Sequence, residues 1–150
     1  MFLKLEFFQH SGTFKARGAV NNILNLSDTQ KNLGITAVSA GNHAIATSFA
    51  ANKFGIRNKV FMYNSANVFR INCVKSYNAN LTLSSPKEAF VNAEKASKEN
   101  GYTIIHPFDG INTIQGTASL GYEISNQIKE LENIIISVGG GGLISGIGSI

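Results

Sequence analysis

The chain has 150 residues, 43% hydrophobic and 15% charged, a composition typical of a folded domain and unlike a disordered or coiled-coil chain. Its 13 Lys and Arg against 9 Asp and Glu give a net charge of +4, but the basic residues are scattered, which argues against a nucleic-acid partner. No apolar run reaches the roughly 18 residues of a membrane span, and no secretory signal is visible. The single cysteine excludes an internal disulfide framework and is typical of the reducing cytoplasm.

Strand-like and helix-like segments alternate along almost the whole chain. Short apolar or alternating runs predict strands over residues 3–7, 35–38, 59–63, 79–83, 102–106 and 133–138. Helical spacing of apolar residues predicts helices over 16–24, 41–54, 66–76, 86–100 and 117–131, with a further short helix after residue 142. Six strands that alternate with helices indicate an α/β fold with a largely parallel sheet.

Several helix boundaries carry their own signals. Ser85 fits an N-cap, Pro86 the first helical position and Glu88 the third position of a capping box. Gly34 is a plausible helix stop before the second predicted strand. Residues 27–28 are expected to close the first helix.

Four consecutive glycines at 139–142 follow the last predicted strand and precede a helix. Without side chains, successive backbone N–H groups can converge on an anion such as a phosphate, and the helix adds its positive end. A P-loop would need a lysine where Leu143 stands, and a dinucleotide fingerprint would need a third glycine where Ile144 or Ser145 stands. Neither motif is present. The glycine run is therefore either a binding site for another kind of phosphate ligand or a turn where a strand and a helix pack closely.

Lys15 stands at the opening of a predicted helix, beside Phe14 and two residues from Arg17. The positive end of a helix and a second cation both favour loss of the lysine proton. A neutral amine is what Schiff-base chemistry requires. The alternative is an ordinary solvated lysine on a helix.

Residues 39–43 offer backbone amides together with the side chains of Ser39, Asn42 and His43, between a strand and a helix. Such a loop suits a carboxylate. The alternative is that the histidine is a capping or core residue.

These segments, in this order, resemble the serine/threonine dehydratase (threonine ammonia-lyase) family of pyridoxal-phosphate (PLP) enzymes, which has fold type II, like the tryptophan synthase β subunit. The stretch around Lys15, at 3–19, resembles the family's lysine motif. The stretch at 37–46 resembles its SAGNHAQG loop. The matching stretches are LKLEFFQHSGTFKARGA at 3–19, AVSAGNHAIA at 37–46, HPFD at 106–109, QGT at 115–117 and VGGGGL at 138–143.

The resemblance implies roles for residues of each segment. Lys15 would be the catalytic lysine that forms the Schiff base with PLP, and Phe14 would pack near the cofactor ring. Asn42 would hydrogen-bond the ring oxygen. The cofactor phosphate would lie on Gly139, Gly140, Gly141 and Gly142, and the pocket for the substrate carboxylate would be lined by Ser39, Ala40, Gly41 and His43.

The implied reaction is elimination of water and ammonia from L-threonine or L-serine, which gives 2-oxobutanoate or pyruvate and suggests a place in amino-acid metabolism such as isoleucine biosynthesis. Ala40 favours dehydration over racemisation, because the family's serine racemases carry a serine there as acid and base. The alternatives are a serine racemase, a threonine synthase, a cysteine-synthase-like enzyme, or a binding domain without turnover. A plain nucleotide-binding domain is the weakest reading.

The resemblance also implies a two-lobed architecture, with a small α/β lobe at 34–107 and a discontinuous large PLP-binding lobe from 1–33 and 108–150. The large lobe is expected to be incomplete, so the chain is expected to be a fragment that leaves sheet edges and apolar helix faces uncovered. Divalent-metal ligands, which relatives often carry, would lie outside this chain. The expected partner is a small amino-acid substrate, with no nucleic acid or membrane, and a homo-oligomer when full length.

Overall fold

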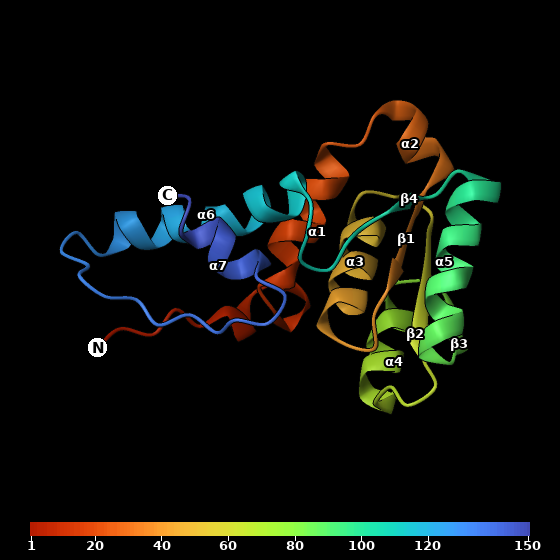
Figure 1. The fold of residues 1–150 in the computed structure, drawn as a ribbon, viewed down its shortest axis with the longest axis horizontal. Helices are drawn as coiled ribbons and strands as arrows, with labels where there is room; N and C mark the ends of the chain where they lie inside the picture. The colour runs from red at the N-terminus through yellow and green to blue at the C-terminus, as the bar shows by residue number, and fades with distance from the viewer.

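The computed structural model describes residues 1–150 and contains one parallel sheet flanked by helices, which confirms the α/β prediction (Figure 1). The strands are β1 (Ile35–Val38), β2 (Asn58–Tyr63), β3 (Asn80–Ser84) and β4 (Thr103–Ile104). The helices are α1 (Lys15–Leu24), α2 (Asp28–Leu33), α3 (Asn42–Lys53), α4 (Val68–Ser76), α5 (Pro86–Asn100), α6 (Ile111–Gln127) and α7 (Gly142–Ile147). Two short 3-10 turns, η1 (Glu6–Phe8) and η2 (His10–Gly12), precede α1.

The sheet has the strand order β3-β2-β1-β4, with all neighbours parallel. Ile35 of β1 is paired with Asn58 of β2 on one side and with Thr103 of β4 on the other. The chain therefore moves outward from β1 through β2 and β3, and then returns to the opposite side of β1. In open α/β sheets, ligands bind beyond the carboxyl ends of the strands at such a reversal.

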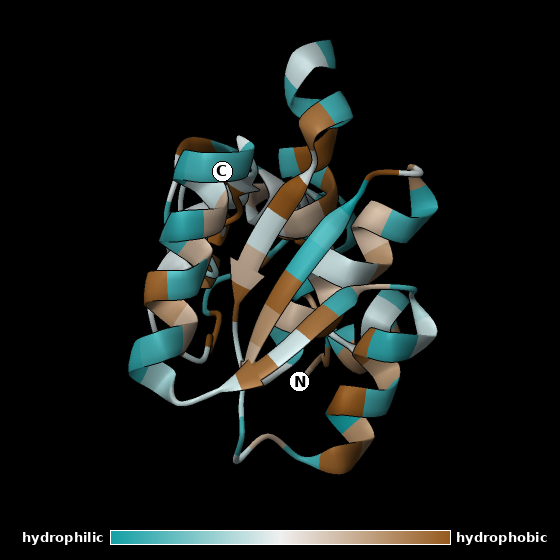
Figure 2. Ribbon diagram, turned by 90° about the vertical axis from the view of Figure 1, so that its right-hand side faces the viewer, coloured by the Kyte–Doolittle hydropathy of each residue, from teal (hydrophilic) through white to brown (hydrophobic).

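Helices cover both faces of the sheet (Figures 1 and 2). Successive β2 residues point to opposite faces, and Val60 and Met62 pack with α3 and α4 residues, while Phe61 packs with alanines of α5. A further part of the core joins α1, α3 and β1, where Ile23 of α1 and Ile35 of β1 are fully buried. The sheet is thus fixed as a rigid platform for the loops at its carboxyl edge.

Helices α6 and α7 lie on the side of α1 that faces away from the sheet (Figure 1). The α1 and α6 backbones come so close that a Cβ atom on Gly116 would stand 2.5 Å from the Arg17 carbonyl oxygen and 2.6 Å from the Gly18 Cα. Contacts this short are not made by real Cβ atoms. Only glycine fits at this crossing, which sets where the first residues of α1 lie.

The structure has four strands, and the predictions of strands at 3–7 and 133–138 are wrong. Residues 3–5 are irregular and run into η1, while residues 129–140 make no backbone–backbone hydrogen bond. Ile135 is completely exposed. A strand needs a neighbour to satisfy its N–H and C=O groups, and no strand of this chain lies beside either segment.

Helix boundaries agree better with the sequence. Ser85 and Glu88 form the predicted capping box at the start of α5, and Gly34 ends α2 with a φ of 104°. Residues 27–28, expected to close the first helix, instead begin α2, with Ser27 in its own capping box with Gln30. Helix α6 begins at Ile111, six residues before the predicted 117.

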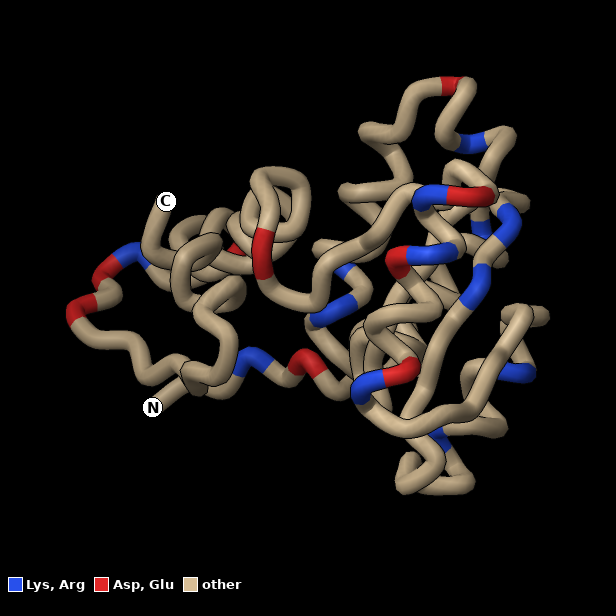
Figure 3. The backbone as a smooth tube through the Cα atoms, turned by 45° about the vertical axis from the view of Figure 1, so that its right-hand side comes forward, with Lys and Arg blue, Asp and Glu red and all other residues tan.

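None of the helices combines the length and apolar character needed to cross a membrane. Lys and Arg lie beside Asp and Glu in α5, whereas residues 29–87 carry seven Lys and Arg and no Asp or Glu (Figure 3). The division into lobes at 34–107 stays a prediction.

We expect Gly116→Ala to lower the free energy of unfolding by about 2 kcal/mol, because the added methyl group forces α1 and α6 apart. Urea denaturation followed by circular dichroism measures this. The matched control is Gly139→Ala, where a Cβ atom meets nothing within 4 Å; its change should stay below about 0.5 kcal/mol. Equal effects of the two substitutions would contradict the close crossing.

Candidate active site

The loops that follow β1 and β4 meet at the reversal of strand order. His43, at the start of α3, lies with its Nε2 atom 2.8 Å from the Ile105 carbonyl oxygen, just after β4. Because a carbonyl only accepts, Nε2 carries the proton of a neutral ring. The side chain is 5% exposed, and burial is the main cause that lowers the pKa of His43 to about 4. His43 therefore joins the two loops as an uncharged group.

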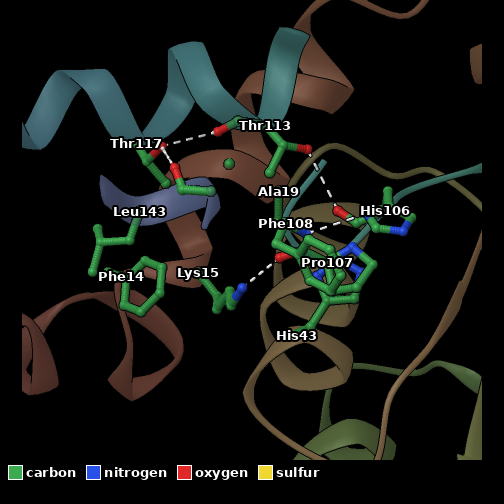
Figure 4. Close-up of a pocket in the computed structure, with 12 residues that line it drawn as sticks. Phe14, Lys15, Ala19, His43, His106, Pro107, Phe108, Thr113, Thr117 and Leu143 are labelled. Atoms are coloured by element: carbon green, nitrogen blue, oxygen red, sulfur yellow. Dashed lines mark hydrogen bonds between the residues drawn. The ribbon is translucent and has the colours of Figure 1, made fainter. Parts of the chain in front are cut away.

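Lys15, the first residue of α1, reaches the same place from outside the sheet (Figure 4). Its ammonium Nζ donates a hydrogen bond to the Pro107 carbonyl oxygen and lies 5.1 Å from the centre of the Phe14 ring. The side chain is partly buried, and this burial lowers the pKa of Lys15 below its usual value. The amine is thus biased toward the neutral form that a nucleophile or base needs.

Arg17 does not act on Lys15 as the sequence suggested. Its side chain is 9% exposed, and its guanidinium forms ion pairs with Glu6 at 2.8 Å and with Glu123 at 2.7 Å. The bonds from Arg17 lower the pKa of Glu123 to about 2. Arg17 therefore ties the N-terminal segment to α6, and the lowered pKa of Lys15 comes from burial.

A small pocket lies beside the Lys15 side chain. It brings together four of the predicted site residues, namely Phe14, Lys15, His43 and Gly142. Figure 4 shows the first three of them around the pocket. The other predicted residues do not line it: Ser39, Ala40, Gly41 and Asn42, together with Gly139, Gly140 and Gly141. These lie next in sequence to His43 and Gly142 respectively.

The pocket also contains residues to which the sequence assigned no role, mainly from the turn after β4. The Pro107 carbonyl accepts from Lys15, and Phe108 and His106 complete the wall. Thr117 of α6 places its Oγ1 atom 2.8 Å from the Gly142 carbonyl oxygen, within hydrogen-bonding distance. The stretches HPFD and QGT were the only signals that could have pointed to these positions.

The glycine run at 139–142 combines close packing with unused backbone N–H groups. Gly140 and Gly142 pack against Phe108, whose ring and carbonyl oxygen occupy the space that Cβ atoms would fill. At Gly139 and Gly141 that space is open, and Gly141 has a φ of 89°. None of the four N–H groups donates to a backbone carbonyl. The run therefore presents free amide donors beside the Lys15 pocket, which is what an anionic group requires.

The loop at residues 39–42 also presents free amides. The Gly41 N–H donates to Ser39 Oγ at 3.1 Å, whereas the N–H groups of Ala40, Asn42 and His43 donate to no backbone carbonyl. The Asn42 side chain is exposed. The loop thus lies at the carboxyl end of β1 with unused donors.

The family described as pyridoxal-phosphate dependent enzymes matches the chain over residues 1–150. The chain belongs to that family. This PLP enzyme chain is 43% identical over 145 residues to the phenylserine dehydratase of Ralstonia pickettii, covering 96% of the chain and 44% of the relative. It is 42% identical over 149 residues to the catabolic L-threonine dehydratase of Staphylococcus aureus strain N315, covering 98% of the chain and 43% of the relative.

Solved structures of PLP enzymes share this fold. Maize serine racemase matches with a TM-score of 0.92 and 35% identity, over 95% of this chain and 44% of that protein. The processed form of threonine deaminase isoform 2 from Solanum lycopersicum matches with a TM-score of 0.90 and 34% identity, over 96% and 43%. The chain has fold type II, and it spans less than half the length of the relatives it matches.

The cofactor of the family is PLP, and the residues present fit it. PLP needs an amine for its aldehyde and donors for its phosphate. Lys15 supplies a partly buried amine whose pKa is lowered, and residues 139–142 supply four free N–H groups beside the same pocket. Which residues bind each part of PLP stays a proposal.

We expect acid to destabilise the protein through His43. Its pKa is lowered in the folded state, so the unfolded chain binds the proton first, and stability falls as the pH drops from about 6.5 to about 4. The loss approaches about 3 kcal/mol. Melting temperatures from pH 7.5 to 4.5 measure it.

Two variants separate His43 from other acid effects. His43→Gln, which keeps a donor for Ile105 without a titrating ring, should flatten the dependence on pH. His10→Gln, which changes an exposed histidine, should leave it unaltered. If the melting temperatures of both variants fall with pH as steeply as that of the wild type, His43 is not the acid-sensitive group.

Proposed function

We propose that the complete protein uses PLP to eliminate water and ammonia from L-threonine or L-serine, giving 2-oxobutanoate or pyruvate. The observation that carries this proposal is the Lys15 amine, which burial biases toward its neutral form inside a pocket that it shares with His43 and Gly142. An amine in that form can attach a carbonyl cofactor and can also accept a proton.

PLP, when bound, supplies an electron sink for the charge that develops at the substrate α-carbon. Lys15 holds the cofactor and then takes the substrate α-proton at Nζ. The Pro107 carbonyl, which accepts from Nζ in the structure, limits the directions in which the amine can point. His43 stays neutral through the working pH range, so it adds no charge that would oppose protonation of Lys15.

We assign the remaining cofactor and substrate contacts to the two amide-rich segments. Gly139 to Gly142 would bind the phosphate through their free N–H groups. Phe14, beside Lys15, would pack near the ring, and Asn42 would bond the ring oxygen. The substrate carboxylate would lie on the loop of Ser39, Ala40 and Gly41, with His43 at its end.

Serine racemisation is the second candidate, because the maize and Dictyostelium discoideum serine racemases have this fold. A racemase must return a proton to the opposite face of the α-carbon from that served by the lysine. In the resemblance described above, a serine at position 40 carries that proton. Ala40 has no group that can do so, which favours elimination. The dehydratase names of the relatives point the same way.

The remaining expectations about the whole protein are also proposals. We propose a small lobe at 34–107 and a large lobe that includes 1–33 and 108–150. We further propose that the complete protein works as a homo-oligomer in the cytoplasm, and that any divalent cation binds outside this chain.

We expect PLP followed by borohydride to modify Lys15 in preference to the other lysines, because burial lowers the pKa of its amine. Peptide mapping by mass spectrometry locates the adduct, and Lys15→Ala should remove it. Labelling spread over surface lysines would refute the assignment. With Lys15 labelled, formation of 2-oxobutanoate from L-threonine by the complete protein tests the reaction itself.

We expect Ala40→Ser to give the PLP-loaded complete protein the ability to form D-serine from L-serine, because the hydroxyl can return a proton to the second face. Chiral chromatography measures the D-serine. The control is Ala40→Gly, which changes the same position without adding a proton donor and should give none. No D-serine from a serine variant that is still labelled at Lys15 would count against the role of position 40.

A further inference from the structure

Arg70, in the first turn of α4, lies directly against the loop at residues 39–42. Its Nη1 atom is 2.8 Å, and its Cζ atom 3.5 Å, from the point where a Cβ atom of Gly41 would stand. Any other residue at position 41 would push this guanidinium away. The absence of a side chain at Gly41 thus allows a cation to approach the backbone of the loop.

Arg70 differs from the other two arginines of the chain in having no partner. Arg17 is paired with two carboxylates, and Arg57 donates to the Asn32 carbonyl oxygen. The Arg70 side chain takes part in no hydrogen bond or ion pair, and it is exposed. Its five donors remain available to a ligand.

The loop beneath Arg70 has donors of its own. The N–H groups of Ala40, Asn42 and His43 are not used by backbone carbonyls, while that of Gly41 is committed to Ser39 Oγ. A planar guanidinium beside free backbone amides matches a carboxylate, which can accept two parallel bonds from arginine and others from N–H groups.

We propose that Arg70, beside Gly41, binds the substrate carboxylate together with the 39–42 loop and so makes the site select amino acids with a free carboxylate. This inference rests on the function proposed above, because it needs the loop to be the carboxylate site. The backbone amides position the carboxylate, and Arg70 supplies the full positive charge that the loop itself lacks. His43 cannot supply it, since burial keeps that ring neutral.

The test compares L-threonine with L-threoninamide, which lacks the carboxylate charge. In the PLP-loaded protein, binding of either ligand is followed by the visible absorbance of the cofactor. Arg70→Gln should raise the Kd for L-threonine about tenfold and leave that for L-threoninamide within about twofold. Arg70→Lys, which keeps the charge but loses the planar fork, should raise the Kd for L-threonine about threefold.

The matched control is Lys75→Gln, which removes a positive charge from the last turn of the same helix. It should change neither Kd beyond twofold. If Arg70→Gln keeps the wild-type preference for L-threonine over L-threoninamide, or if Lys75→Gln loses it equally, the proposal is overturned.

A second measurement needs no cofactor and therefore separates this inference from the function it rests on. Sodium acetate is titrated into the cofactor-free chain, and the amide resonances of Ala40, Asn42 and His43 are followed by NMR. We expect acetate to shift these resonances in the wild-type and Lys75→Gln chains and not in Arg70→Gln. If the Gln variant does not fold, Arg70→Lys takes its place, and acetate should then bind it more weakly than it binds the wild type. Equal shifts in all variants would overturn the proposal. Failure of borohydride to label Lys15 would instead overturn the proposed function.

Discussion

The reversal of strand order at β1 is the constraint on which the site depends. Because β2 and β4 flank β1, the loop after β1 and the turn after β4 leave the sheet at the same edge and lie side by side. The bond from His43 to the Ile105 carbonyl oxygen then joins them. Every other group of the site, Lys15 included, is placed relative to this pair of loops. A sheet wound in one direction only would have carried β4 away from them.

Glycines determine how closely the segments around the site pack against one another. Gly116 lets α1 and α6 touch at Arg17 and Gly18, which determines where Lys15 enters. Gly140 and Gly142 let the glycine run pack against Phe108, so Gly142 and the turn after β4 line the same pocket. Glycine therefore has two roles in this chain, because it lets segments pack closely and it leaves backbone N–H groups accessible. Both roles are needed to bring the Lys15 amine close to the N–H groups of residues 139–142.

The sequence predicted the elements whose signals are local. Ser85, Pro86 and Glu88 mark the start of α5 because capping involves only neighbours in the chain. The strands expected at 3–7 and 133–138 failed because strand formation depends on a partner, and apolar alternation says nothing about whether one is present. The same limit applies to α6, whose early start at Ile111 follows from its packing against α1.

The site shows the same division between local and distant information. Motifs pointed to Lys15, Gly142 and His43, which the fold does bring into one pocket. The Pro107 carbonyl could not be foreseen, because every residue has a carbonyl and only the path of the chain selects one. Arg70 was missed because its approach to Gly41 depends on how α4 lies beside α3.

The ion pairs of Arg17 bear on which parts of the molecule can open independently. Residues 1–12 bury little apolar surface, and Glu6 and Lys4 fasten them to Arg17 and Glu123. No residue of this segment lines the Lys15 pocket. Local fraying of the N-terminal segment, which amide hydrogen exchange would register as low protection, therefore removes none of the residues that line this pocket. Opening at this end of the chain and burial of Lys15 thus involve different residues, although Lys15 is only the fifteenth residue of the chain.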